Sequence, residues 1–289
     1  MNKMKVKFSE RFERNDSPLK IILIYAILIL FCLISIYPIS FIFTVSLRPA
    51  NNLFSTSLSL IPKGATFENY RQAFIQYDLL SWLKNSTIIA SLATLFSVLL
   101  SISAGYAFSR FEFRGRSTGM TMLLVTQMFP ATMTLLPLYL MLIKLGFANK
   151  MAGLVIVYIS TNIPFNVWMM KGYFDTIPKS LEESAYVDGA GIFKTFYQII
   201  LPLVTPAIAL SALNSFMGAW SEYIVARVMI TDAGKLTLPV GLTNMQGQFS
   251  TAWGIYSAAA LMTALPVIII FISLSKYLVG GLTLGSVKG

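Results

Sequence analysis

Long apolar runs separated by short polar segments make up most of this chain. Six of the runs are close to or above the roughly 20 residues that an α-helix needs to cross a bilayer. Because a backbone inside lipid must satisfy its own hydrogen bonds, we expect an all-α integral membrane protein with six transmembrane helices. The runs are Leu19–Val45, Asn85–Ser109, Met120–Ile143, Ala152–Met170, Pro202–Ala226 and Ile255–Ser275.

The runs and the segments between them give an expected division of the chain. Residues 1–18 precede a first transmembrane helix at 19–45, and an extracytoplasmic loop at 46–84 follows it. Five further helices form a core at 85–278, and a polar tail follows at 279–289. Prolines should kink or start helices without preventing their insertion. They lie in or at the ends of the runs, at positions 38, 130, 137, 164, 206 and 266.

The distribution of Lys and Arg predicts the orientation of these helices. Basic residues are more frequent in the segments on the side of the amino terminus, and the compact turn Arg110–Arg116 is the clearest example. Cytoplasmic loops carry such an excess of basic residues. We therefore expect both termini, and the polar segment at 171–201, to lie in the cytoplasm.

Composition supports a membrane protein and removes several function classes. The chain is 56% hydrophobic and only 12% charged, whereas soluble domains are about 25% charged. It has no His and a single Cys, Cys32, so it cannot form a His-containing metal site, a Ser-His-Asp or Cys-His arrangement, or an internal disulfide. The net charge of +10 is explained by the basic cytoplasmic flanks, and we expect no nucleic-acid partner.

The most informative polar segment lies between the fourth and fifth runs. Pro178 suits the first turn of a helix, and acidic residues follow where the helix dipole favours them. Gly189 can adopt the left-handed conformation that ends a helix. A second short helix with an apolar face should follow from Ile192, and Pro202 should then open the next transmembrane helix. The segment is predicted to be a helix-turn-helix along the inner membrane surface.

Two interpretations of this helix-turn-helix remain open from the residues alone. The small Ser184 and Ala185 would allow another protein to approach closely, and Glu182, Glu183 and Asp188 could pair with its basic residues. Alternatively, the acids only stabilise the start of a surface helix and the aromatic residues only rest at the interface. Capping is sufficient to explain the acids without a partner.

A longer motif resembles the signature of the permease subunits of binding-protein-dependent ABC importers. That signature reads Glu-Ala-Ala, three residues, Gly, nine residues, Ile-x-Leu-Pro. The single departure here is Ser184 in place of Ala, which is a small change. The matching positions are Glu183, Ser184, Ala185, Gly189, Ile199, Leu201 and Pro202.

Other segments are similar to the sugar-importing branch of this family. They are Asn85-Ser86, Ala104–Arg110, Met128–Pro130 and Trp220–Tyr223, and the tail 280–289 resembles that of maltose permease subunits. The resemblance implies the type I importer fold and a permease for maltose or maltodextrin, with other oligosaccharides as an alternative. It also implies a second, MalF-like permease subunit, a MalK-like ATPase dimer, an extracytoplasmic sugar-binding protein and membrane lipids as partners.

In that family the helix-turn-helix fits a cleft on the ATPase subunit. This chain itself lacks the G-x-x-x-x-G-K-[ST] loop that would bind a triphosphate. The resemblance therefore implies a non-catalytic subunit that binds no cofactor, with ATP and Mg²⁺ used by the partner. Residues 178–202 become the coupling element. Its implied ATPase-coupling residues are Glu182, Glu183, Ser184, Ala185, Asp188, Gly189, Ile199, Leu201 and Pro202, and the implied tail contacts are Thr283, Gly285, Lys288 and Gly289.

The outer side of the chain gives less specific candidates. Trp220 and Glu222 could line a pathway, and Leu238 and Pro239 belong to a segment, residues 234–250, that resembles the part approaching the binding protein. An ion-coupled secondary transporter is the main alternative function. Such proteins place ionisable residues at mid-membrane, and the runs here have almost none.

Overall fold

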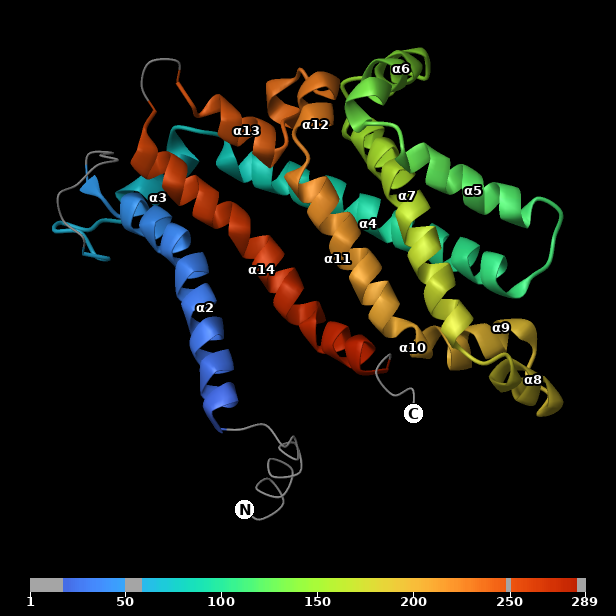
Figure 1. The fold of residues 1–289 in the computed structure, drawn as a ribbon. Coiled ribbons are helices and arrows are strands. Elements are labelled where there is room, and N and C mark those ends of the chain that lie inside the picture. Colours follow the sequence, from blue (N-terminus) through green and yellow to red (C-terminus); the bar gives the residue numbers. More distant parts are fainter. Residues whose placement is uncertain (1–17, 50–58, 248–250, 285–289) are drawn as a thin grey trace.

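The computed structural model describes residues 18–49, 59–247 and 251–284, and every regular element in these ranges is a helix. Figure 1 shows the long helices side by side, with short helices at both ends of the molecule. The elements are α2 (Pro18–Ser46), α3 (Glu68–Ile75), α4 (Leu79–Arg110), α5 (Arg116–Gln127), α6 (Ala131–Lys144), α7 (Met151–Thr176), α8 (Ser180–Val187), α9 (Ile192–Thr195), the π-helix η3 (Phe196–Ile200), α10 (Leu201–Leu203), α11 (Thr205–Ser221), α12 (Ile224–Met229), the 3₁₀-helix η4 (Ala233–Lys235), α13 (Leu238–Asn244) and α14 (Trp253–Leu284).

Four helices are long and apolar enough to cross a membrane on their own: α2, α4, α7 and α14. Two bent pairs raise the number to as many as 6 if each pair counts as one span. One pair is α5 with α6, bent by 106°, and the other joins Ile192–Leu203 to α11 with a bend of 72°. The all-α class and the range of spans agree with the pattern of apolar runs.

The third predicted run, Met120–Ile143, is divided in the structure. Helix α5 ends before Pro130, which has the extended ψ of 134° and precedes the first residue of α6. A proline has no backbone N–H to continue a helix, and its ring disfavours a helical conformation in the preceding residue. Pro137, which has the same limitation, lies inside α6 without ending it.

The fifth predicted run, Pro202–Ala226, also has different limits. Helix α11 covers only Thr205–Ser221, and the chain leaves the helical conformation at Glu222, where ψ is 125°. The separate helix α12 then begins at Ile224. The carboxylate of Glu222 accepts the backbone N–H groups at the start of α12, which stabilises this second helix start.

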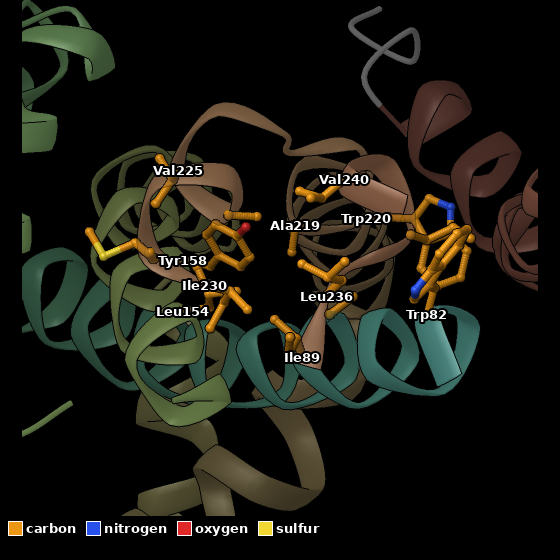
Figure 2. Close-up of a cluster of buried hydrophobic side chains, with 14 of the residues drawn as sticks. Trp82, Ile89, Leu154, Tyr158, Ala219, Trp220, Val225, Ile230, Leu236 and Val240 are labelled. Carbon is orange, nitrogen blue, oxygen red and sulfur yellow. The ribbon is translucent and has the colours of Figure 1, made fainter. Parts of the chain in front are cut away.

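Helix α4 lies at the centre of the packing, against α7 and α11, and α14 packs on α11 and α2. A Cβ atom added to Gly105 of α4 would lie only 2.7 Å from Cβ of Met170 on α7, so the two helices approach closely there. The larger core joins α4, α7, α11, α12 and α13 toward the end of the molecule that carries α13 (Figure 2). A smaller core joins α4, α7 and the start of α11 at the other end.

Candidate functional site

The coupling element begins with the helix α8, which ends at a glycine as the sequence predicts. Gly189 has a φ of +82°, and its N–H bonds to the carbonyl of Tyr186 at 3.0 Å. The N–H of Ala190 bonds to the carbonyl of Ala185 at 2.9 Å. This pair of bonds is the Schellman arrangement that satisfies the last carbonyls of a helix. The predicted glycine-stopped helix is therefore confirmed.

The second half of the coupling element is longer than predicted. Helix α9, the π-helix η3 and α10 follow one another without a gap from Ile192 to Leu203. The N–H of Leu201 bonds to the carbonyl of Phe196, five residues earlier, as a π-helix requires. The prediction that Pro202 opens the next transmembrane helix is wrong, because the 72° bend follows Leu203 and α11 starts at Thr205.

One face of α8 points into the protein. Glu182 is 6% exposed and Ala185 is 5% exposed. One carboxylate oxygen of Glu182 pairs with Arg110 of α4, and the other accepts the hydroxyl of Tyr106 at 2.9 Å. The prediction that Glu182 and Ala185 face another protein is therefore corrected: both lie inside this chain.

The opposite face of the coupling element is open to contact. Glu183, Ser184, Asp188 and Gly189 are all exposed. Large apolar side chains lie beside them: Val187 is 88% exposed, Phe193 is 80% exposed, and Ile192, Tyr197, Leu181 and Tyr186 are also exposed. Residues Glu183, Ser184, Val187, Asp188, Gly189, Ile192, Phe193 and Tyr197 form what we call the outer face.

The last part of the sequence motif has a packing role. Ile199 and Leu201 are half-buried and pack against the smaller core, which includes Phe174 of α7 and Ile200. Pro202 is exposed. These residues connect the outer face to the membrane helices.

The predicted tail contacts are only partly described. The backbone at Thr283 is helical, because α14 extends to Leu284 beyond the run predicted to end at Ser275. Gly285, Lys288 and Gly289 lie outside the described residues.

The pathway candidates Trp220 and Glu222 have structural partners. Trp220 is 5% exposed, its ring stacks on Phe216 with centroids 5.4 Å apart, and its Nε1 donates to the carbonyl of Thr263 at 3.2 Å. Glu222 accepts the hydroxyl of Tyr158 at 2.8 Å in addition to the N–H groups of α12. Trp220 is therefore a core residue, and Glu222 stabilises the start of α12.

The segment containing Leu238 and Pro239 folds back onto the amino-terminal part of α4. Leu238 is buried and donates its N–H to Ser86 Oγ at 2.7 Å, while Pro239 is half-buried in the first turn of α13. The side-chain amide of Asn85 donates to two carbonyl oxygens just before α13, each at 3.0 Å. Leu238 is thus not a surface contact, and residues 248–250 of the predicted segment 234–250 lie outside the description.

The sequence reasoning missed Tyr106 and Arg110 as parts of the site. Both belong to the segment Ala104–Arg110, which is notable for its similarity to sugar permeases, and Arg110 also belongs to the basic turn Arg110–Arg116 that indicates the orientation. Their partner Glu182 lies 76 and 72 positions away. The available signal in the sequence was the pair of adjacent acids, Glu182 and Glu183, on a short helix. The spacing along one helix does not show which of the two acids is buried.

Comparison with known proteins places these features in a wider group. Residues 97–280 match the profile of a family described as "Binding-protein-dependent transport system inner membrane component". The permease protein GanQ of the galactooligosaccharide transport system of Bacillus subtilis is 37% identical, over 94% of this chain and 96% of that protein. The maltose/maltodextrin permease protein MalG of Escherichia coli K12 is 34% identical, over 93% and 96% of the two chains.

A solved structure agrees with these similarities. A chain of a bacterial ABC transporter that imports the acidic polysaccharide alginate superposes with a TM-score of 0.77 at 25% identity. The superposition covers 91% of this chain and 98% of that one. A second alginate transporter structure, in complex with an alginate-bound periplasmic protein, has a TM-score of 0.63 at 18% identity and shows the shared fold.

Proposed function

The chain belongs to the family of inner-membrane components of binding-protein-dependent transport systems, and we therefore propose that it is the permease subunit of an ATP-driven importer of maltose or maltodextrin. It is a multi-pass membrane protein and a non-catalytic transport subunit, so ATP hydrolysis belongs to a separate ATPase subunit. Permeases named for maltose or maltodextrin from several bacteria support the substrate class.

The outer face of the coupling element is the observation that carries this proposal. It exposes Val187 and Phe193 to solvent beside the acids Glu183 and Asp188. Large apolar side chains rimmed by polar groups are typical of a protein contact surface. A short helix of this kind fits a groove on a partner, where the acids can pair with Arg or Lys. The partner is the ATPase dimer.

The same proposal includes the remaining partners and the orientation. A second permease subunit would complete the translocation pathway, and an extracytoplasmic binding protein would deliver the sugar. The coupling element would face the cytoplasm with both termini, and Thr283, Gly285, Lys288 and Gly289 would contact the ATPase. Figure 1 supports a shared side, because α8 and α9 lie at the end of the molecule where α2 begins and α14 ends.

The experiment is reconstitution of uptake. The chain is assembled in proteoliposomes with a MalF-like permease subunit and a MalK-like ATPase from the same organism, and the matching binding protein is added with radiolabelled maltotriose. We expect uptake that needs ATP and the binding protein and that continues when proton and sodium gradients are abolished. A complex whose ATPase lacks its phosphate-binding Lys is the control. Uptake driven by an ion gradient without ATP would contradict the proposal in favour of a secondary transporter.

A second substrate class follows from the similarity to the galactooligosaccharide permease. Competition in the same assay distinguishes the two. Excess unlabelled galactooligosaccharide should leave maltotriose uptake unchanged if the system is specific for maltodextrin. Strong inhibition, together with direct uptake of a labelled galactooligosaccharide, would assign the other substrate and would leave the permease function intact.

A further inference from the structure

A buried polar cluster connects the coupling element to the inner end of α4. Nε of Arg110 pairs with one carboxylate oxygen of Glu182, and the hydroxyl of Tyr106 donates to the other at 2.9 Å. The side chains of the ion pair are only 6% and 8% exposed. Glu182 therefore uses both oxygens within the chain, across a sequence separation of more than 70 residues.

Arg110 also bonds to the chain that leads into α8. Its Nη2 donates to the carbonyl of Ile177 at 2.9 Å, between α7 and α8, and its Nη1 donates to Ser109 Oγ at 3.1 Å. The hydroxyl of Ser109 in turn donates to Asp175 of α7 at 2.6 Å. The last turn of α4 is thus fixed to both ends of the connection between α7 and α8.

The ring of Tyr106 completes the connection on its apolar side. Its centroid lies 4.6 Å from that of Phe196 in the second half of the coupling element and 5.4 Å from that of Phe174 on α7. Tyr106 is itself buried in the smaller core. One side chain of α4 therefore contacts α7, α8 and η3, and it contacts α8 by a hydrogen bond to Glu182.

This arrangement fixes a geometry more than it adds stability. A buried ion pair adds little net stability compared with apolar residues of the same size, but it is strongly sensitive to the loss of one partner. The side chains also have specific directions, since the carboxylate receives one donor on each oxygen. Helix α8 packs against α9, and these side-chain bonds attach it directly to a membrane-crossing helix.

We propose that Arg110, Tyr106 and Glu182 form a positioning latch that makes α8 and the inner end of α4 move as one unit. A displacement that the ATPase imposes on the outer face is then transmitted to α4 through these side-chain contacts. It also reaches α7 and α11, which are joined to the coupling element by the backbone. The inference rests on the proposed function. It separates two neighbouring acids: Glu183 contacts the partner, and Glu182 holds α8 to α4.

The test compares variants in the complete transporter in proteoliposomes. Glu182→Gln and Arg110→Gln are made beside Glu183→Gln, and the exposed Glu112→Gln is the matched control. For the Glu182 and Arg110 variants we expect the ATPase to copurify as with the unchanged chain, and maltotriose uptake per ATP hydrolysed to fall about tenfold, as a buried pair that has lost one partner loses its fixed geometry. Glu112→Gln should behave as the unchanged chain.

Two further variants show whether the residues act together. The double variant Glu182→Gln with Arg110→Gln should lose less uptake than the two single losses combined, because the ion pair that they share is removed in each single variant and is counted twice in their sum. Tyr106→Phe keeps the ring and deletes only one hydroxyl, so the fold is retained. It should lower the sugar transported per ATP while the melting temperature of the purified complex stays close to that of the unchanged chain. A purely structural role for this hydroxyl would leave that ratio unaltered.

The outcomes that overturn the latch differ from those that overturn the function. Normal coupling in both Glu182→Gln and Tyr106→Phe would show that the cluster transmits nothing. Loss of ATPase copurification by Glu182→Gln, to the same degree as by Glu183→Gln, would make Glu182 a direct contact. In both results the unchanged chain still transports. If the unchanged chain neither binds the ATPase nor transports with ATP, the proposed function fails and the latch with it.

Discussion

At the residue scale, two adjacent acids on α8 face different surroundings. Glu182 is buried against Tyr106 and Arg110, whereas Glu183 is exposed on the outer face. Gly189 separates the two helices of the coupling element with a φ of +82°. A Cβ at this position would meet no atom within 4 Å, so within the chain the constraint there comes from the backbone conformation alone.

Replacement of Gly189 tests that constraint. Gly189→Val should reduce ATPase copurification and sugar uptake by about tenfold, because a left-handed conformation costs an L-residue roughly 1–2 kcal/mol. Insertion into the membrane should be unchanged. Gly189→Asn is the matched variant, since Asn tolerates this conformation, and it should retain more uptake than the Val variant. Equal loss of uptake in both variants would mean that any side chain at this position obstructs the docking surface. Normal uptake in Gly189→Val would contradict the strained turn.

At the element scale, the breaks between helices shape this molecule as much as the helices do. The chain bends by 72° between the coupling element and α11, and by 106° between α5 and α6. At the end of α11 away from the coupling element, the helix stops at Ser221 and Glu222 starts α12. These breaks place short helices at both ends of the bundle (Figure 1).

The close approach of α4 and α7 gives a prediction at this scale. Gly105→Val should lower the melting temperature of the purified protein and reduce transport, because the added side chain would collide with Met170 and with the backbone of Lys171. Gly172→Ala, on α7 itself, is the control: nothing lies within 4 Å of its added Cβ, and Ala favours the helix by about 1 kcal/mol. A Gly105→Val protein with unchanged melting and uptake would contradict the observed helix contact.

At the scale of the whole molecule, the two ends carry different surfaces. One end bears the acidic and apolar outer face, and the other bears α13, which is fixed to α4 by Asn85 and Ser86. Large apolar side chains on α2, α5 and α6 are exposed along the bundle. Such exposure suits contact with lipid and with a second permease subunit.

Cysteine labelling tests the predicted sidedness. The chain has a single Cys, Cys32, which is first replaced by Ser. In cells that lack the ATPase, which would cover the outer face, Val187→Cys should then react with a membrane-impermeant maleimide in inverted vesicles only. Ile61→Cys should react in intact cells or spheroplasts only, since the two positions are exposed on opposite sides of the predicted membrane. The reverse labelling would show that the orientation is inverted. Labelling of both positions from one side would contradict the arrangement of the spans.

Local rules account for the features that the sequence predicts correctly. Apolar runs of membrane length must become helices in lipid, because no other open structure satisfies their backbone there. Gly189 ends α8 because a residue without a side chain tolerates a positive φ. The motif from Glu183 to Pro202 identifies the family from side chains close in sequence, and residues 97–280 match that family.

Tertiary contacts decide the role of residues that these local rules cannot distinguish. Glu182 and Glu183 are the same residue type in the same helical turn, and only the presence of Arg110 and Tyr106, more than 70 positions earlier, makes one of them internal. Trp220 is a core residue and not a pathway residue, because it is buried, its ring stacks on Phe216 and its Nε1 donates to the carbonyl of Thr263. The free energy of burying each side chain depends on neighbours that the folded chain brings together, so its role is set by the tertiary structure.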